Sequence, residues 1–160
     1  MNTGANSYSR PFLSLIITAG LLAGTLDILS AFTYFFIKTG KNPLNVLVYV
    51  SKVALGEKAF AGNTMQQISG LLVHFAIAFG WTILFFILYP RIKWLQINKF
   101  ITAIVYGIFV WTMMNMLILP LWNNKPFVFK PEASTINCLI LMVAIGMPLS
   151  FVASKYYSKK

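Results

Sequence analysis

Residues 66–88 read QQISGLLVHFAIAFGWTILFFIL, an apolar run in which His74 is the only ionisable residue. At a rise of 1.5 Å per residue, a helix over this stretch is about 34 Å long, which is enough to cross the roughly 30 Å hydrocarbon core of a bilayer. Pro90 and Arg91 follow the run and favour a helix end with a cation at the level of the lipid head groups. The run therefore predicts a membrane-spanning α-helix.

Three further runs have a similar length and apolar character, and they cover residues 11–37, 99–119 and 133–153. Helices are expected in all of them, because polar backbone groups in lipid must be hydrogen-bonded within the segment. The first run is longer than the core of about 7 to 15 residues in a cleavable signal peptide, so we expect it to be retained. The sequence predicts an all-α, integral membrane four-helix bundle that forms a single membrane domain over residues 1–160.

A shorter helix is predicted between the first two spans, over residues 43–55. Asn42 and Pro43 are typical of a helix start, and Gly56 is typical of a helix stop. The segment is too short to span a bilayer and too apolar to be fully solvated. Three placements therefore remain open: along the membrane interface, re-entrant into the bilayer, or packed over the mouth of the bundle.

The composition indicates the surroundings of the chain. Hydrophobic residues make up 58% of it and charged residues 10%, whereas charged residues are about 25% of a typical soluble domain. The formal net charge is +10, but the cations lie at the ends of the apolar runs or in the loops and form no long basic run. We therefore expect the lipid bilayer, and no nucleic acid, to be the partner of this positive charge.

The distribution of Lys and Arg predicts the orientation. The side that carries both termini has Arg10, Arg91, Lys93, Lys99, Lys155, Lys159 and Lys160, and the opposite side has Lys38, Lys41, Lys52, Lys58, Lys125 and Lys130. The first set is the denser one, because three of its members lie in the short connection from 91 to 99. Since cytoplasmic loops are richer in Lys and Arg, both termini are predicted to be cytoplasmic.

Four polar side chains within the predicted spans are candidates for function: Asp27, His74, Asn115 and Asn137. Measured from the middle of each span, with the direction reversed for successive helices, all four fall in the same half of the membrane. They lie about 4 to 11 Å from the midplane at 1.5 Å per residue. The sequence therefore predicts one polar layer in the leaflet that faces the loops after spans one and three.

Small residues at three- and four-residue spacing mark the expected helix contacts, and they are Gly20, Gly24, Gly70 and Ala78. Small residues allow two membrane helices to approach closely. Spans one and two are therefore predicted to meet along these stripes, with Asp27 within reach of His74. Such a pair is a candidate proton-handling site, because ionisable groups in lipid are often functional and histidine titrates near neutrality. A structural hydrogen bond between helices is an equally valid interpretation.

Several chemistries are excluded by the residue inventory. With one His and one Cys, the chain cannot build a metal site of three or four His and Cys ligands, and Cys138 lies within the fourth span. No serine has an identifiable base other than His74, and no glycine-rich loop follows a strand. We therefore expect no enzymatic activity, no metal and no cofactor.

Short motifs in the middle of the chain resemble the YagU-like family of small bacterial inner-membrane proteins. They are HFAIAF at 74–79, YPRIK at 89–93, Gly107 and LPL at 119–121, and the glycines of 20–24 fit the first helix of that family. Asn115 departs from the family, in which a His is expected at this position. The resemblance implies a multi-span fold in a bacterial cytoplasmic (inner) membrane, and it implies no established activity.

Two classes of function remain open. One is proton-linked transport or conduction through the Asp27 and His74 layer, expected in a homo-oligomer because four helices enclose little pore. The other is a non-transporting membrane scaffold or envelope-stress protein, in which the polar layer fixes helix register. Replacement of Asp27 should abolish activity in the first class and reduce stability in the second.

Overall fold

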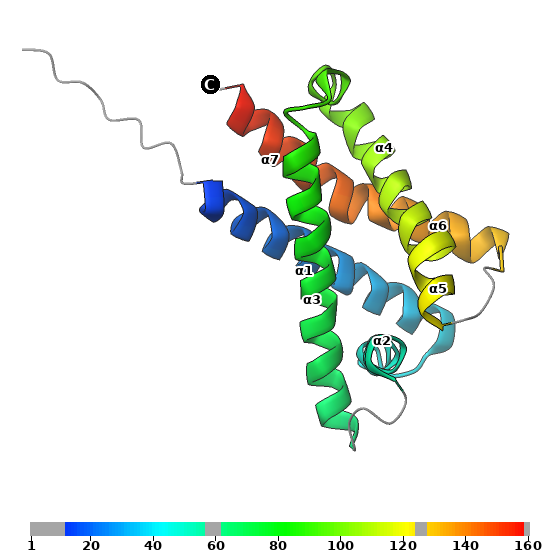
Figure 1. Cartoon of the computed structure of the whole chain (residues 1–160). Helices are drawn as coiled ribbons and strands as arrows, with labels where there is room; N and C mark the ends of the chain where they lie inside the picture. Colours follow the sequence, from blue (N-terminus) through cyan, green and yellow to red (C-terminus); the bar gives the residue numbers. More distant parts are fainter. Residues whose placement is uncertain (1–11, 57–61, 124–127, 159–160) are drawn as a thin grey trace, which may run out of the picture.

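The computed structural model describes residues 12–56, 62–123 and 128–158, and within these ranges it contains helices and no strand. Four helical segments are long and apolar enough to cross a membrane. The first two are α1 (Phe12–Thr39) and α3 (Asn63–Leu88). A shorter helix, α2 (Asn45–Leu55), lies between them in the chain, as predicted. The expected all-α four-helix architecture is thus confirmed (Figure 1).

The third and fourth spans each consist of three consecutive helical pieces. Span three, Lys99–Trp122, is formed by α4 (Lys99–Thr112), the π-helical segment η2 (Met113–Ile118) and α5 (Leu119–Asn123). Span four, Pro131–Tyr157, is formed by α6 (Pro131–Leu141), the π-helical segment η3 (Met142–Gly146) and α7 (Met147–Tyr157). A short 3₁₀ helix, η1 (Lys93–Gln96), precedes α4.

Local sequence explains where several helices begin and end. The side-chain oxygen of Asn98 accepts a hydrogen bond from the backbone N–H of Phe100 at 2.8 Å and so caps the start of α4. Pro131 opens α6, where its missing N–H would have no partner in the helix. Gly56 ends α2 with a φ of 90°, a conformation that residues with a side chain rarely adopt.

Both π segments are explained by prolines. Span three was expected to end at residue 119, but its helix continues through Pro120. Pro120 lacks the N–H that would bond to Met116, and Pro148 likewise leaves Ala144 without this partner. Met116 and Ala144 both lie within a π segment, where hydrogen bonds reach back five residues, as from the N–H of Leu119 to Met114, and the helix is wider. A proline in these spans therefore widens the helix and does not end it.

The other predicted boundaries differ from the helix ends by a few residues. Span two begins at Asn63, three residues before 66, and span four reaches from Pro131 to Tyr157. The predicted start of span one at 11 lies outside the described residues, as do the predicted flanking charges of Arg10, Lys58, Lys125, Lys159 and Lys160.

The spans pack in two pairs that also contact each other. Helix α1 packs on α3 and on the fourth span, and α4 packs on η3 and α7. The core occupies the half of the bundle nearer the start of α1 and the end of α7. Its buried residues include Leu15, Ala19, Phe85, Phe86, Tyr106 and Leu149. Tyr106 donates a 2.6 Å hydrogen bond to the backbone oxygen of Trp81 and so joins α4 to α3. This half of the bundle is closely packed with aromatic rings, and we refer to it as the aromatic core.

The predicted small-residue contacts are found in part between α1 and α3. A Cβ atom on Gly24 would lie 2.9 Å from a ring carbon of Phe75 and 3.1 Å from the Cβ of Ala78, and one on Gly20 would crowd Phe79. Gly70, in contrast, faces α2, because a Cβ there would collide with the backbone of Leu47. The prediction that Gly70 joins the first two spans is corrected by this contact.

Helix α2 is held against α3 by a buried polar contact as well. The hydroxyls of Ser51 and Ser69 form a 2.7 Å hydrogen bond next to the close approach at Gly70. In Figure 1, α2 is seen end-on beside the lower part of α3, near the ends of α1 and α5. The short helix is therefore part of the helix packing at the end of the bundle opposite the aromatic core.

Candidate functional site

A cavity of about 310 Å³ lies in the half of the bundle that is nearer α2. All four spans and α2 contribute to its wall, which is mainly aliphatic. Trp81, Val110 and Ile145 line the cavity and also belong to the aromatic core, so they separate the two. The cavity thus occupies one half of the bundle, and the packed core fills the other.

The structure brings all four predicted polar residues to this cavity. Asp27 comes from α1, His74 from α3, Asn115 from η2 and Asn137 from α6. The first three are half-buried, whereas Asn137 is more exposed. Since each residue comes from a different span, their convergence depends on the packing of the whole bundle.

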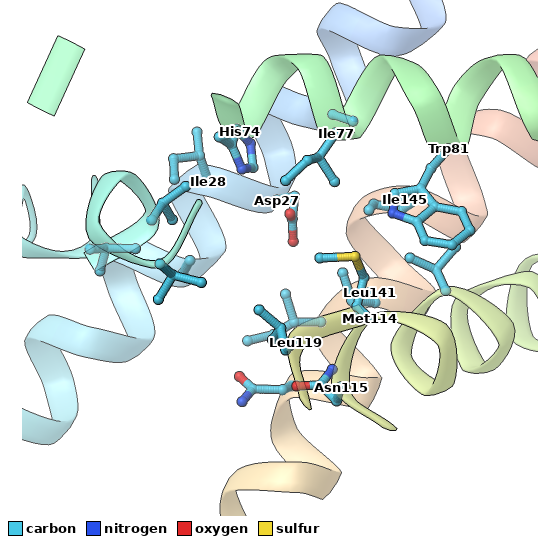
Figure 2. Close-up of a pocket in the computed structure, with 18 of the residues that line it drawn as sticks. Asp27, Ile28, His74, Ile77, Trp81, Met114, Asn115, Leu119, Leu141 and Ile145 are labelled. Carbon is cyan, nitrogen blue, oxygen red and sulfur yellow. The ribbon is translucent and has the colours of Figure 1, made fainter. Parts of the chain in front are cut away.

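Among the residues that the structure describes, Asp27 is the only acidic one that lines the cavity. Figure 2 shows its carboxyl group in the space between His74 and Leu119. Its carboxylate interacts electrostatically with His74, and within the described part of the chain it makes no hydrogen bond. The hydrogen-bonding capacity of this carboxylate, about four lone-pair sites when ionised, is therefore unused by the described protein groups.

His74 joins two helices through its ring. Its Nε2 lies 2.9 Å from the backbone carbonyl oxygen of Gly24 on α1. A carbonyl oxygen can only accept, so Nε2 carries the proton and donates this bond. His74 lies near Asp27, as predicted, but its hydrogen bond is made to the backbone of α1 one turn before Asp27.

The π segment of span three determines how Asn115 is placed. Its side-chain amide donates a 2.9 Å hydrogen bond to the backbone oxygen of Trp111, four residues earlier. This bond and the widened helix around it hold the residue in position at the cavity wall. Segments of this kind are rare and occur frequently at functional sites.

Two aromatic residues of the site were not among the predicted site residues. Tyr49 on α2 and Trp81 on α3 both line the cavity. A signal for Tyr49 was present, because Val46, Tyr49, Val50 and Val53 follow the spacing of a single helix face, and all four line the cavity. The contribution of α2 could therefore have been derived from its periodicity once the helix was assigned.

The chemistry of the site is that of one carboxylate and one imidazole in mainly apolar surroundings. Such a pair can exchange a proton or hold a polar or charged ligand. Among the described residues, no group of three or more His, Cys, Asp or Glu side chains is arranged to hold a metal ion.

Comparison with known proteins adds no assignment, since no protein-family model, curated protein or solved structure matches the chain.

Proposed function

We propose that this four-span membrane protein carries out proton-linked transport or conduction through the cavity, with Asp27 as the proton-exchanging group and His74 beside it. The observation that carries the proposal is the convergence of the four polar residues, one from each span, on a single cavity. Ionisable groups within membrane spans are energetically costly, and they often mark substrate or proton pathways.

The aromatic core defines the form of transport that the proposal requires. It fills the half of the bundle beyond Trp81, so the cavity is not continued there as an open pore. A proton or ligand that enters from the α2 end could leave on the other side only after the spans move relative to one another. The π segments of spans three and four, in which the regular hydrogen-bonding pattern is altered, supply suitable sites for such motion.

The proposal is tested by proton flux into proteoliposomes. A potassium gradient with valinomycin drives proton entry, and a trapped pH-sensitive dye reports it. The wild-type protein should exceed protein-free vesicles several-fold, and Asp27→Asn should return the rate to background. Glu132→Gln is the matched control, because Glu132 is an exposed acid paired with Lys38 outside the cavity, and it should leave the flux unchanged. Equal flux in wild-type and protein-free vesicles would overturn the proposal.

A second candidate function, that of a non-transporting scaffold or envelope-stress protein, is favoured by the hydrogen bond between His74 and Gly24. This bond joins α1 to α3, as expected of a side chain that fixes helix register. Under this alternative, Asp27→Asn would change stability without abolishing any flux. The same vesicle assay, combined with a denaturation curve for each variant, separates the two functions.

We further propose that the chain lies in a bacterial cytoplasmic membrane with both termini cytoplasmic, is related to the YagU-like family, and acts as a homo-oligomer without enzymatic activity. The charge distribution supports the orientation, and the motifs at 74–79 and 89–93 support the family. A reporter that is active only in the cytoplasm, fused after residue 160, should be active. The opposite result would reverse the orientation and leave the cavity chemistry unchanged.

A further inference from the structure

The cavity combines features that suit one class of ligand. It contains a single acidic side chain, Asp27, and no Lys or Arg among its described lining residues. The remainder of the wall is mainly aliphatic, with the aromatic residues Tyr49 and Trp81. A ligand matched to this wall carries one positive charge and a predominantly apolar body.

The carboxylate is available to such a ligand. Asp27 makes no hydrogen bond within the described part of the chain, and the Nε2 proton of His74 is donated to Gly24 and not to the carboxylate. An ionised carboxylate in mainly apolar surroundings is costly unless it is paired with an opposite charge. A cationic ligand would supply that charge within the cavity.

The aromatic residues of the wall, Tyr49 and Trp81, also favour a cationic ligand. A positive charge near the face of a tryptophan or tyrosine ring is attracted by the electrons of the ring, and this attraction is the usual means of recognising quaternary ammonium groups. A divalent metal ion fits less well, because it prefers several oxygen ligands and this wall is mainly hydrocarbon. An anion would meet no Lys or Arg among the described residues of the wall and would lie next to Asp27.

We propose that the cavity binds a small organic monocation, an amine or quaternary ammonium with an apolar body, with Asp27 as its counter-ion and the two aromatic residues against it. The inference rests on the proposed function, for which it names the substrate class. The volume of about 310 Å³ limits the ligand, since it is at the lower end of the roughly 300–1,000 Å³ range of small-molecule sites.

The experiment is equilibrium binding to the purified full-length protein in lipid nanodiscs, measured by calorimetry. The probe is benzyltrimethylammonium, and its comparison compound is neopentylbenzene, which has the same shape with carbon in place of the charged nitrogen. Wild-type protein should bind the cation saturably and at least tenfold more tightly than the neutral isostere. Binding of the two compounds with equal affinity would overturn the proposal, because the carboxylate would then have no role.

Variants assign the binding to the cavity. Asp27→Asn should weaken cation binding at least tenfold, whereas Glu132→Gln, outside the cavity, should leave it unchanged. Because Asp27→Asn could affect folding, Ala54→Phe provides a second test, since it fills part of the cavity from α2 and keeps the carboxylate. It should also weaken binding, with wild-type helix content as the control for folding. Unchanged binding in both cavity variants would overturn the proposal.

The binding and flux measurements test the ligand class and proton-linked transport separately, so either proposal can be overturned without the other. Cation binding that depends on Asp27 without any proton flux would support the ligand class and overturn proton-linked transport. Proton flux that depends on Asp27 without cation binding would support transport and overturn the ligand class.

Discussion

The imidazole Nε2 of His74 lies 2.9 Å from the carbonyl oxygen of Gly24, three residues before Asp27 on α1. The contact is possible because Gly24 has no side chain to separate the two helices at this level. Gly24 therefore contributes both to the close spacing of α1 and α3 and to the position of the imidazole near the carboxylate.

The substitution Gly24→Ala should destabilise the protein by about 1–3 kcal/mol, the usual cost of overpacking a filled contact. Its Cβ would lie 2.9 Å from a ring carbon of Phe75. The measurement is a reversible denaturation curve in mixed detergent micelles. Gly80→Ala is the matched control, since nothing lies within 4 Å of the added atom, and it should be neutral or stabilising by up to about 1 kcal/mol. Equal destabilisation by both substitutions would contradict the close approach.

Removal of the Tyr106 hydroxyl should cost about 0.6–1.5 kcal/mol, in the range of single hydrogen bonds in membrane and soluble proteins. Tyr106→Phe deletes the 2.6 Å bond to Trp81 and keeps the ring that packs on Phe85. The same denaturation assay measures the loss. Tyr49→Phe alters a largely exposed tyrosine and should leave the midpoint unchanged. A midpoint for Tyr106→Phe that matches wild type would show that this bond does not hold α4 to α3.

Gly70→Ala should release α2 from α3 without unfolding the spans. The added Cβ would collide with the backbone of Leu47, and backbone atoms cannot move aside as a flexible side chain can. Hydrogen exchange followed by mass spectrometry should show faster exchange over residues 45–55, with little change in the core around Phe85. If exchange rose equally over all helices, α2 would be integral to the stability of the bundle and not a separately docked element.

The substitution Pro120→Ala should convert η2 toward a regular α-helix, because it restores an N–H able to bond to Met116. Loss of the widened turn would rotate Asn115 relative to the cavity, so flux and cation binding should fall while stability is kept or rises. Pro131→Ala is the control, since Pro131 opens α6 and should have no such effect. Wild-type flux and binding in Pro120→Ala would show that the π segment does not position the site.

Most of the architecture followed from hydropathy. Spans such as 66–88 are long enough to cross a bilayer and carry almost no charge, and lipid allows few alternatives to a helix for such a segment. The short helix was predicted from Asn42, Pro43 and Gly56. It ends before Gly56 as predicted, but it begins at Asn45, so the prediction that Asn42 caps it is wrong. The same level for Asp27, His74, Asn115 and Asn137 was predicted from their spacing along regular helices, and all four line one cavity.

The sequence by itself determined the apolar helices, because composition and the need to satisfy backbone groups within each segment leave few alternatives. That the polar residues of these helices share one membrane depth stays a prediction. The tertiary structure alone decided that Gly70 faces α2 and that His74 bonds to the backbone of Gly24. These features depend on which helix packs beside which and on how each is rotated about its axis. That choice is made by contacts between residues far apart in the chain, which spacing along one helix does not specify.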